Sequence, residues 1–265
     1  MIKNNPKISI VMSTYNGSKF IKDSIVSVIN QSYKDFEFII INDCSTDNVE
    51  KIIKEFLSKD DRIIYIKNEK NLKLTASLNK WLNLSRWKYI ARIDDDDIWM
   101  DGKLETQIKF MEKNTDYWLL WTGSIIMDDE WKVLGYLSVK EDDKKIRKNI
   151  LSGNQFVHSS VLFRKAALKE VWWYYDVKYN WAEDYELWLR MWQKSKFANI
   201  NEPLIKYRWL ETSISRKKWL KQWLLSIKIS IVNRNHYSCF FKSFLIRIIS
   251  TFIPQKIKRY ILLKK

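Results

Sequence analysis

Hydrophobic residues in the first hundred positions alternate between short continuous runs and stretches with helical spacing. The short runs are rich in β-branched residues and predict buried strands. They cover residues 7–13, 36–43, 62–68 and 88–93. The stretches between them carry apolar side chains every three or four positions, which predicts amphipathic helices. They cover residues 17–33, 46–57 and 74–84. This alternation is typical of an α/β fold, with a Rossmann-like, mostly parallel sheet flanked by helices.

The alternation loosens beyond residue 101. The pattern there predicts a helix at residues 103–112, a hairpin around residues 128–131 and a strand at residues 156–163. Residues 183–191 have the apolar spacing of another amphipathic helix. We therefore expect one domain over residues 1–215, with halves at 1–100 and 101–215, followed by a tail at 216–265.

The tail predicts two or three amphipathic helices of strongly positive charge. No acidic residue follows Glu211, and residues 212–265 hold 13 of the Lys and Arg residues that give the chain its net charge of +16. Lys242 and Arg247 interrupt its longest apolar run well short of the roughly 20 residues that a spanning helix needs. Two interpretations stay open: interfacial helices on an anionic membrane, or helices that dock on the sheet and expose their Lys residues.

Cysteine and histidine are too few for two common kinds of site. Cys44 and Cys239 lie far apart, and no apolar segment stands near Met1, so we expect neither a disulfide framework nor secretion. The expected location is the cytoplasm, with the tail at the inner face of the membrane. His158 and His236 are the two histidines, and no paired cysteines occur, which argues against zinc. A metal would have to be held by carboxylates.

The strongest chemical signal is a run of four carboxylates, Asp94 to Asp97, directly after a predicted strand. Adjacent carboxylates repel one another unless a cation or another partner neutralises them. In open parallel sheets, ligands bind at the carboxyl ends of the strands. The run therefore predicts a hard cation that bridges to phosphate oxygens, with a solvated acidic loop as the alternative.

Two further polar sites accompany this run. Asn42 and Asp43 end a predicted strand, where an acidic side chain could accept hydrogen bonds from a nucleoside. Glu183 and Asp184 open a predicted helix. Carboxylates in a first helical turn stabilise the helix dipole, and the functional alternative is a general base.

Taken together, the motifs resemble the family 2 glycosyltransferases of the GT-A fold. The matching segments are SIVMSTYNG at 9–17, IIINDCSTDN at 39–48, YIARIDDDD at 89–97 and AEDYELWLR at 182–190. Residues 155–165 and 207–216 resemble the intervening segments of the family, so the resemblance covers roughly residues 7–216. It implies a half that binds the nucleotide-sugar, residues 1–100, and an acceptor half, residues 101–215.

The resemblance also implies roles for particular residues. The nucleoside would be held by Ser13, Tyr15 and Asp43. The outer carboxylates of the D-x-D metal motif would be Asp94 and Asp96, and the catalytic base would be Asp184. Contacts to donor or acceptor are open for Asp95, His158 and Glu183. For His158 we favour a neutral, hydrogen-bonded strand histidine.

The implied activity is inverting transfer of a hexose from a nucleotide-sugar, UDP-linked in our expectation, with Mn²⁺ or Mg²⁺. The acceptor would be a glycan or lipid-linked hydroxyl in cell-envelope polysaccharide synthesis. One alternative is a nucleic-acid-binding protein whose tail stacks bases on Trp219, Trp223 and Tyr237. The acidic run opposes it, because carboxylates without metal repel phosphates, so we expect no nucleic acid partner. A catalytically inactive sugar-nucleotide binder is the second alternative.

Tryptophan stands at several positions where glycine is expected. The chain has 14 Trp and only 5 Gly, whereas about 7% Gly is average. One hypothesis is that the gene uses UGA for glycine and that these codons are written here as tryptophan. The other is a protein that is rich in tryptophan. The suspect positions are Trp81, Trp87, Trp118, Trp121, Trp131, Trp172, Trp173, Trp181 and Trp192.

Overall fold

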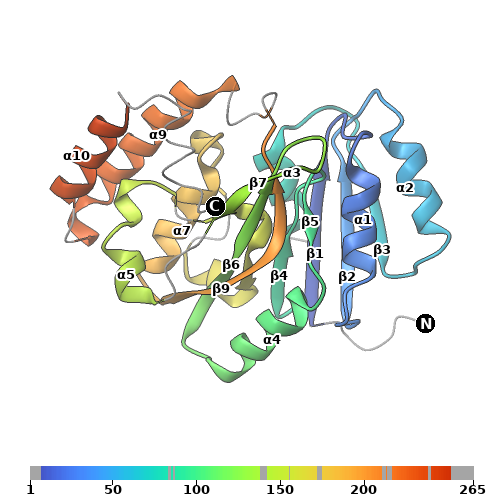
Figure 1. Cartoon of the computed structure of the whole chain (residues 1–265), viewed down its shortest axis with the longest axis horizontal. Coiled ribbons are helices and arrows are strands. Elements are labelled where there is room, and N and C mark those ends of the chain that lie inside the picture. The colour runs from blue at the N-terminus through green and yellow to red at the C-terminus, as the bar shows by residue number, and fades with distance from the viewer. Residues whose placement is uncertain are drawn as a thin grey trace.

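The computed structural model describes residues 7–82, 85, 87–137, 142–154, 156–171, 175–210, 213, 217–237 and 240–251. A sheet with the strand order β3-β2-β1-β4-β8-β6-β9-β5 runs through the molecule, and β7 pairs with β6 (Figure 1). The strands are β1 (Ile8–Thr14), β2 (Phe36–Asn42), β3 (Ile63–Lys67), β4 (Tyr89–Arg92), β5 (Ile98–Trp99), β6 (Tyr117–Met127), β7 (Val133–Leu137), β8 (Leu162–Arg164) and β9 (Lys196–Arg208).

The first four strands form the parallel part of the sheet. β1 pairs in parallel with β2 and β4, and β2 pairs in parallel with β3. Alternate residues of β1 enter different cores: Ile8 and Ile10 pack with helices on one face, and Val11 packs on the other. A strand that is covered on both faces has a continuous apolar run in its sequence, and for this reason these strands could be predicted.

The remaining strands make the sheet mixed. β8 lies antiparallel between β4 and β6, while β6 and β9 run parallel along most of their length. β5 pairs antiparallel with β9, so the strand that follows the acidic run is hydrogen-bonded to a strand that lies about a hundred residues later in the chain. The two halves of the sequence therefore share one sheet.

The helices cover both faces of this sheet. They are α1 (Ile21–Ile29), α2 (Val49–Leu57), α3 (Leu74–Leu82), α4 (Lys103–Lys113), α5 (Asp143–Arg147), α6 (Lys165–Glu170), α7 (Glu183–Trp192), α9 (Trp219–Val232) and α10 (Phe240–Thr251). Short 3₁₀ turns lie at η1 (Ile150–Ser152), η2 (His158–Ser160), η3 (Val177–Tyr179) and η4 (Arg234–His236). Apolar residues of α1, α2 and α4 share one core, and those of α3, α5 and α7 share the other.

The predicted α/β class, the hairpin and the helices are confirmed, but one predicted strand is wrong. Residues 156–163 form the η2 turn and then the short β8, because Ser159 and Ser160 turn their hydroxyls to partners inside the molecule. His158 therefore lies in a turn and not in a strand.

The tail docks on the domain through hydrogen bonds from inward-facing polar groups. The hydroxyl of Tyr237 donates to the carbonyl of Leu189 in α7 over 3.0 Å. The buried Arg247 donates from Nε to the carbonyl of Leu151 over 2.6 Å and from Nη2 to the hydroxyl of Tyr185 over 2.8 Å. Across the described parts of the chain, no helix has the length and apolar character needed to cross a membrane.

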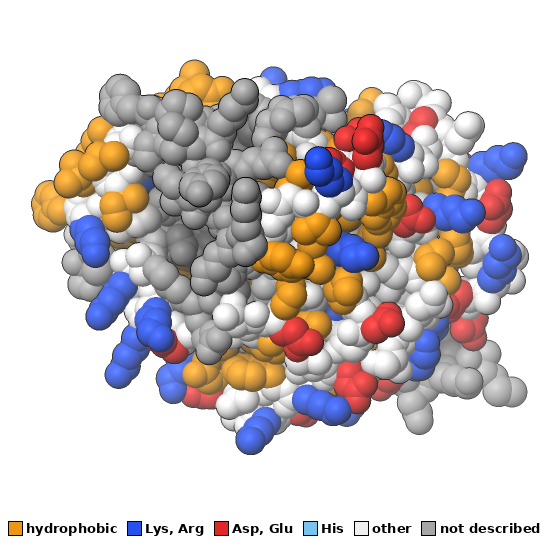
Figure 2. All heavy atoms as spheres, in the orientation of Figure 1, with side chains coloured by type: hydrophobic (Ala, Val, Ile, Leu, Met, Phe, Trp, Pro, Cys, Tyr) orange, Lys and Arg blue, Asp and Glu red, His pale blue; other side chains and the backbone are white. Residues whose placement is uncertain are grey.

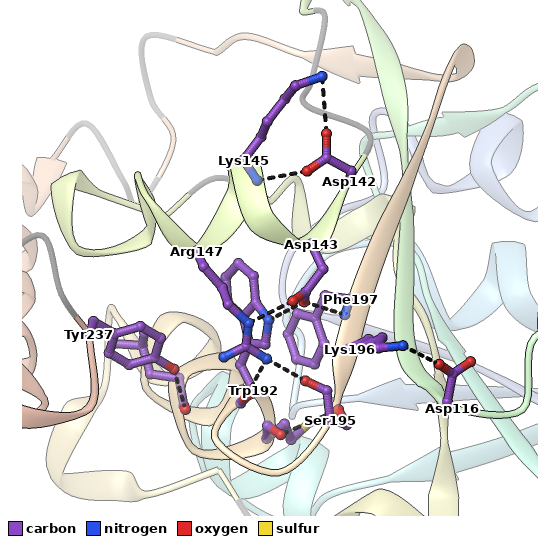
Figure 3. Close-up of polar contacts among 12 residues, drawn as sticks. Asp116, Asp142, Asp143, Lys145, Arg147, Trp192, Ser195, Lys196, Phe197 and Tyr237 are labelled. Atoms are coloured by element: carbon purple, nitrogen blue, oxygen red, sulfur yellow. Dashed lines mark hydrogen bonds and ion pairs between the residues drawn. The ribbon is translucent and has the colours of Figure 1, made fainter.

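The suspect tryptophans fall into two structural groups. Trp131, in the turn between β6 and β7, has φ = 70°, and Trp181, just before α7, has φ = 89°. These left-handed conformations favour glycine, as the glycine hypothesis requires. Trp192 is different, because it is fully buried, stacks on Phe197 at 4.9 Å and donates from its ring to Asp143 (Figure 3).

The other suspect positions say less about whether glycine or tryptophan fits them. Trp118 and Trp121 lie within β6, and Trp87 is buried just before β4. The ring nitrogens of Trp87 and Trp121 are buried without a hydrogen-bond partner among the described residues. Trp172, Trp173 and the side chain of Trp81 lie outside the described residues.

Candidate active site at the end of the acidic strand

The acidic run follows β4 at the carboxyl end of the parallel strands. Carboxylate oxygens of Asp94, Asp96 and Asp97 lie within 4.8 Å of one another. Burial and the charge of Asp97 raise the pKa of Asp96 well above its ordinary value. Burial and the charge of Asp94 raise the pKa of Asp97 to about 8. Such mutual repulsion is what a divalent cation would remove.

Asp94 is held by a buried ion pair. The guanidinium of Arg92, on β4, donates from Nη1 and Nη2 to the two carboxylate oxygens of Asp94. The hydroxyl of Ser159 donates to Asp94 Oδ2 over 3.0 Å and accepts from the Asp94 amide over 2.7 Å. Bidentate pairing of this kind fixes the carboxylate in one orientation.

Asp97 is held by the end of β9. Its Oδ1 accepts the backbone N–H of Arg208 over 2.8 Å. The Arg208 side chain donates from Nε to the carbonyl of Asp96 over 2.9 Å. Asp97 Oδ2 is buried and has no hydrogen-bond partner among the residues that the structure describes. An orphaned carboxylate oxygen beside two other carboxylates fits the oxygen donor set of Mg²⁺ or Mn²⁺.

Asp95 points away from these three carboxylates toward the end of β1. Its Oδ2 accepts from the hydroxyl of Thr14 over 2.5 Å, and its carbonyl accepts from the hydroxyl of Ser24. A Cβ on Gly17 would lie 2.0 Å from Asp95 Oδ2. The glycine of the SIVMSTYNG segment therefore leaves the space that this carboxylate occupies. Burial raises the pKa of Asp95 to about 6.

The residues expected to hold a nucleoside lie at the ends of β1 and β2. Ser13 is half-buried in β1, and the Tyr15 side chain is 52% exposed. Asp43 is buried, and its carboxylate accepts the backbone N–H groups of Leu72 and Lys73, over 2.8 and 2.9 Å. Asn68 and Ser77 donate to the same carboxylate. Asp43 thus orders the loop before α3.

Asp184 and Glu183 form the first turn of α7, as predicted. Burial raises the pKa of Asp184, while the charge of Arg92 and a 2.6 Å hydrogen bond from Nδ2 of Asn154 act to lower it. Glu183 is 6% exposed and accepts the N–H of Trp181 over 2.7 Å. Burial and the charge of Asp184 raise the pKa of Glu183 to about 7.

His158 lies buried in this site beside Tyr175 and Trp188. Its Nε2 lies 2.9 Å from the hydroxyl of Tyr175, and its ring packs edge-on against Trp188. Burial, and then the charge of Arg92, lower its pKa well below the ordinary value. The expectation of a neutral, hydrogen-bonded histidine holds, although its element is a turn.

Arg92 connects the two acidic groups of the site. Burial acts to lower the pKa of Arg92, but the charge and hydrogen bonds of Asp94 and, more weakly, the charges of Tyr175 and Asp184 raise it above the ordinary value. The acidic run after β4 and the carboxylates that open α7 therefore act on one buried guanidinium. Sequence reasoning missed Arg92, Asn154 and Arg208, and it gave Asp97 no role. Asp97 could have been found as the fourth carboxylate of the acidic run, and Arg92 as a charged residue within the YIARIDDDD segment.

Comparison with known proteins agrees with this architecture. Residues 9–172 match the model of the family described as glycosyl transferase family 2. MJ1057, a glycosyltransferase of Methanocaldococcus jannaschii, is 42% identical over 77% of this chain and 71% of its own length. The Escherichia coli UDP-Glc:alpha-D-GlcNAc-diphosphoundecaprenol beta-1,3-glucosyltransferase WfgD is 31% identical over 82% of this chain and 83% of its own.

A solved structure supports the fold independently. The chain superposes on S. aureus TarS residues 1–349, solved with UDP-GlcNAc, with a TM-score of 0.69 and 17% identity. The match covers 85% of this chain and 66% of the TarS fragment. The family match spans most of the sheet and the acidic run, and MJ1057 extends the likeness over three quarters of the chain. The chain therefore belongs to glycosyl transferase family 2 and is a glycosyltransferase.

Proposed function

We propose that this glycosyltransferase is an inverting enzyme that moves a hexose from a UDP-linked donor to a hydroxyl of a glycan or lipid-linked acceptor in cell-envelope polysaccharide synthesis. The observation that carries the proposal is the group of three carboxylates, Asp94, Asp96 and Asp97, whose oxygens lie within 4.8 Å of one another at the carboxyl end of the parallel strands. The name of the relative WfgD, a UDP-glucose-dependent enzyme with a lipid diphosphate acceptor, supports the donor and the acceptor class.

The acidic run would hold the divalent cation, Mn²⁺ or Mg²⁺, that is typical of this family. Asp94 and Asp96 take the roles implied by the D-x-D motif, and Asp97 adds a third carboxylate with an unpartnered oxygen. When bound, the cation neutralises the charge that develops on the departing diphosphate. Arg92 and Ser159 keep Asp94 in place for this task.

The nucleoside would lie over the ends of β1 and β2. The exposed ring of Tyr15 is free to cover a base, and Ser13 lies two residues before it on the same strand end. Asp43 acts by ordering the loop before α3, which forms one wall. Asp95 supports the same end of β1 through Thr14.

Asp184 would remove the acceptor proton. As the acceptor oxygen attacks the anomeric carbon, its proton passes to the Asp184 carboxylate, and the nucleoside diphosphate leaves from the opposite face of the sugar. A single displacement of this kind inverts the anomeric centre. A carboxylate whose pKa is raised by burial is a better base at neutral pH than an exposed one. Glu183 and the neutral His158 would contact donor or acceptor beside it.

The decisive experiment is a calorimetric titration of UDP with and without Mn²⁺, followed by a transfer assay. We expect binding that needs the metal, is lost in Asp96→Ala and is kept in Asp184→Asn. Transfer in Asp184→Asn should fall by about 10² to 10⁴-fold, the usual contribution of a general base. Asp101→Asn is the matched control, since this exposed carboxylate lies just beyond the run and should change neither readout.

Three outcomes would overturn parts of the proposal. Well-folded protein that does not bind UDP would refute the UDP donor. Metal-dependent binding without transfer to any acceptor would favour the catalytically inactive binder. Tight binding of RNA or DNA would favour the nucleic-acid alternative, which is already weakened because Tyr237, one of its three stacking residues, is buried against α7.

A further inference from the structure

Helix α10 exposes several large apolar residues to the outside and buries two polar residues, Ser243 and Arg247. The exposed fractions are 85% for Phe241, 57% for Leu245 and 53% for Ile249, against 1% for Ser243 and 4% for Arg247. Positions four and eight residues apart lie on one face of a helix, so the three apolar residues share the outer face. In a helix that faces water, the hydrophobic effect favours the opposite arrangement.

Hydrogen bonds fix this orientation. Arg247 donates to the carbonyl of Leu151 and to the hydroxyl of Tyr185, and the Ser243 hydroxyl lies 3.1 Å from that of Ser152. Rotating α10 to bury its apolar face would break these bonds and leave buried polar groups unpaired, which is costly. The outward apolar face is therefore a property of the docked helix.

Helix α9 shows the same inversion near its end. Leu224 and Val232 are 54% and 59% exposed, whereas Ser230 and Asn233 are buried. In the described residues, ten of the sixteen large apolar side chains that are exposed belong to α9 and α10. Figure 2 shows them as an apolar area at the left edge of the molecule, over these two helices. An area of this kind marks an interaction site.

The charged residues of the tail itself are all basic. The exposed charged residues of the described tail are Lys217, Lys218, Lys221, Lys228, Arg234 and Lys242. No acidic residue occurs after Glu211. A second copy would bring the same positive charge to the contact, and like charges oppose association. A layer with an apolar interior and anionic headgroups matches both properties.

We infer that the outer face of α9 and α10 inserts into the headgroup region of an anionic lipid bilayer. Phe241, Leu245 and Ile249 enter the apolar boundary, and exposed cations of the tail such as Lys217, Lys218 and Lys242 contact lipid phosphates. The helices lie in the interface and do not span it. The biological reason rests on the proposed function, because a lipid-linked acceptor is found at this surface, but binding to vesicles requires neither donor nor cation.

The test is flotation of the full chain with vesicles of phosphatidylcholine and phosphatidylglycerol, compared with phosphatidylcholine alone. We expect the protein to float with the anionic vesicles. The triple variant F241S/L245S/I249S should bind at least about tenfold less, because the apolar area that it removes drives insertion. The control variant I64S/V177S removes two comparably exposed apolar residues outside the tail, and it should float like the parent.

The salt dependence of vesicle binding distinguishes insertion of apolar residues from attraction by surface charge. Part of the binding should survive 0.5 M NaCl, since screening weakens the Lys contacts but not the apolar ones. Complete loss in salt, equal flotation of the triple variant and the parent, or no flotation of the parent would each overturn the inference. Dimerisation that the triple variant abolishes, without vesicle binding, would assign the face to a second copy.

UDP titration of the same samples keeps the two proposals apart. The triple variant should bind UDP like the parent, which also shows that it is folded. If flotation holds but UDP is not bound, the donor proposal fails and the membrane face stands.

Discussion

Asn154 Nδ2 lies 2.6 Å from Asp184 Oδ2, so the loop after η1 is hydrogen-bonded to the first turn of α7. This bond stabilises the charged form of the carboxylate and lowers its pKa, against the effect of burial. The pKa of the proposed base, Asp184, is therefore adjusted by a side chain that comes from a different element.

Asn154→Ala should shift the pH dependence of transfer. A base works only when it is deprotonated, so the rate is lost as the pH falls through the pKa of Asp184. Without the Asn154 bond that pKa rises, and the acidic limb of the rate profile should move to higher pH. Asn235→Ala, at an exposed tail position, is the control. A limb that stays in place would show that Asn154 does not set the pKa of the base.

Lys103→Met should change how stability depends on pH. Lys103 is fully buried, its Nζ lies 2.7 Å from Gln107 Oε1 and 3.9 Å from the Trp99 ring centroid, and burial holds its pKa well below the ordinary value. Between the folded pKa and about 10.4, the unfolded chain binds a proton that the folded chain does not. The free energy of unfolding therefore rises with pH in this window.

Urea unfolding at several pH values between 7 and 9 measures the effect. The Met variant should lose the slope that Lys103 causes, and it should be at least as stable as the parent at pH 7, because the desolvation penalty is gone. Lys109→Met, on the exposed side of the same helix, should keep the slope. An unchanged slope in Lys103→Met would mean that the amine keeps its proton in the folded state.

Trp131→Gly and Trp192→Gly should have opposite effects on stability. Trp131 is 43% exposed and has φ = 70°, where a residue with a Cβ costs about 1 to 2 kcal/mol. Replacing Trp131 by glycine removes this strain and should raise the free energy of unfolding. The gain should reach no more than about 1 kcal/mol, because glycine has more entropy in the unfolded chain, which offsets part of it. Trp192 is fully buried, so its removal should cost at least about 3 kcal/mol.

The gene sequence checks the glycine hypothesis directly. UGA codons at the nine suspect positions would support it, and UGG codons there would end it. Denaturant unfolding of the two variants tests the backbone argument separately. A destabilised Trp131→Gly would show that contacts of the indole, which lies 4.2 Å from the Arg208 guanidinium, outweigh the strain of the turn.

Arg247→Leu should destabilise the catalytic domain although it lies in the tail. The change leaves the carbonyl of Leu151 and the hydroxyl of Tyr185 without their charged donor, at a cost of about 2 to 4 kcal/mol. Lys242→Leu, an exposed cation on the same helix, should have little effect. Thermal unfolding of both variants makes the comparison, and equal stability would mean that α10 docks without Arg247.

The order of helices and strands was predictable because it depends on local periodicity. β1 and β2 are covered on both faces, so their apolar runs are unbroken and easy to recognise. The site was predictable only where its residues stand together in the chain, as in Asp94 to Asp97 and in Glu183 and Asp184. Arg208 lies 111 residues from Asp97, and no spacing rule connects them.

The wrong prediction of a strand at 156–163 also reflects a contact between residues far apart in the sequence. The segment FVHSSVLF is apolar at both ends and polar in the middle, and the serine hydroxyls in the middle bond to Asp94 and to the carbonyl of Val157. The hydrogen bond from Ser159 to Asp94 joins residues 65 positions apart, and the periodicity of a sequence cannot predict such a contact.

The pairing of β5 with β9 limits how this enzyme could exchange parts with its relatives. A recombinant could join residues 1–100 of this chain to the second half of a relative. Its acidic run would then lie beside the β9 of that relative in place of this chain's Arg208, and Asp94 would lose Ser159 as its partner. The proposed cation site is thus held by residues from both halves of the sequence, and both have to be inherited together. New acceptor specificity should arise by substitution along the surface of the second half, with the strand ends kept, and not by shuffling of whole modules.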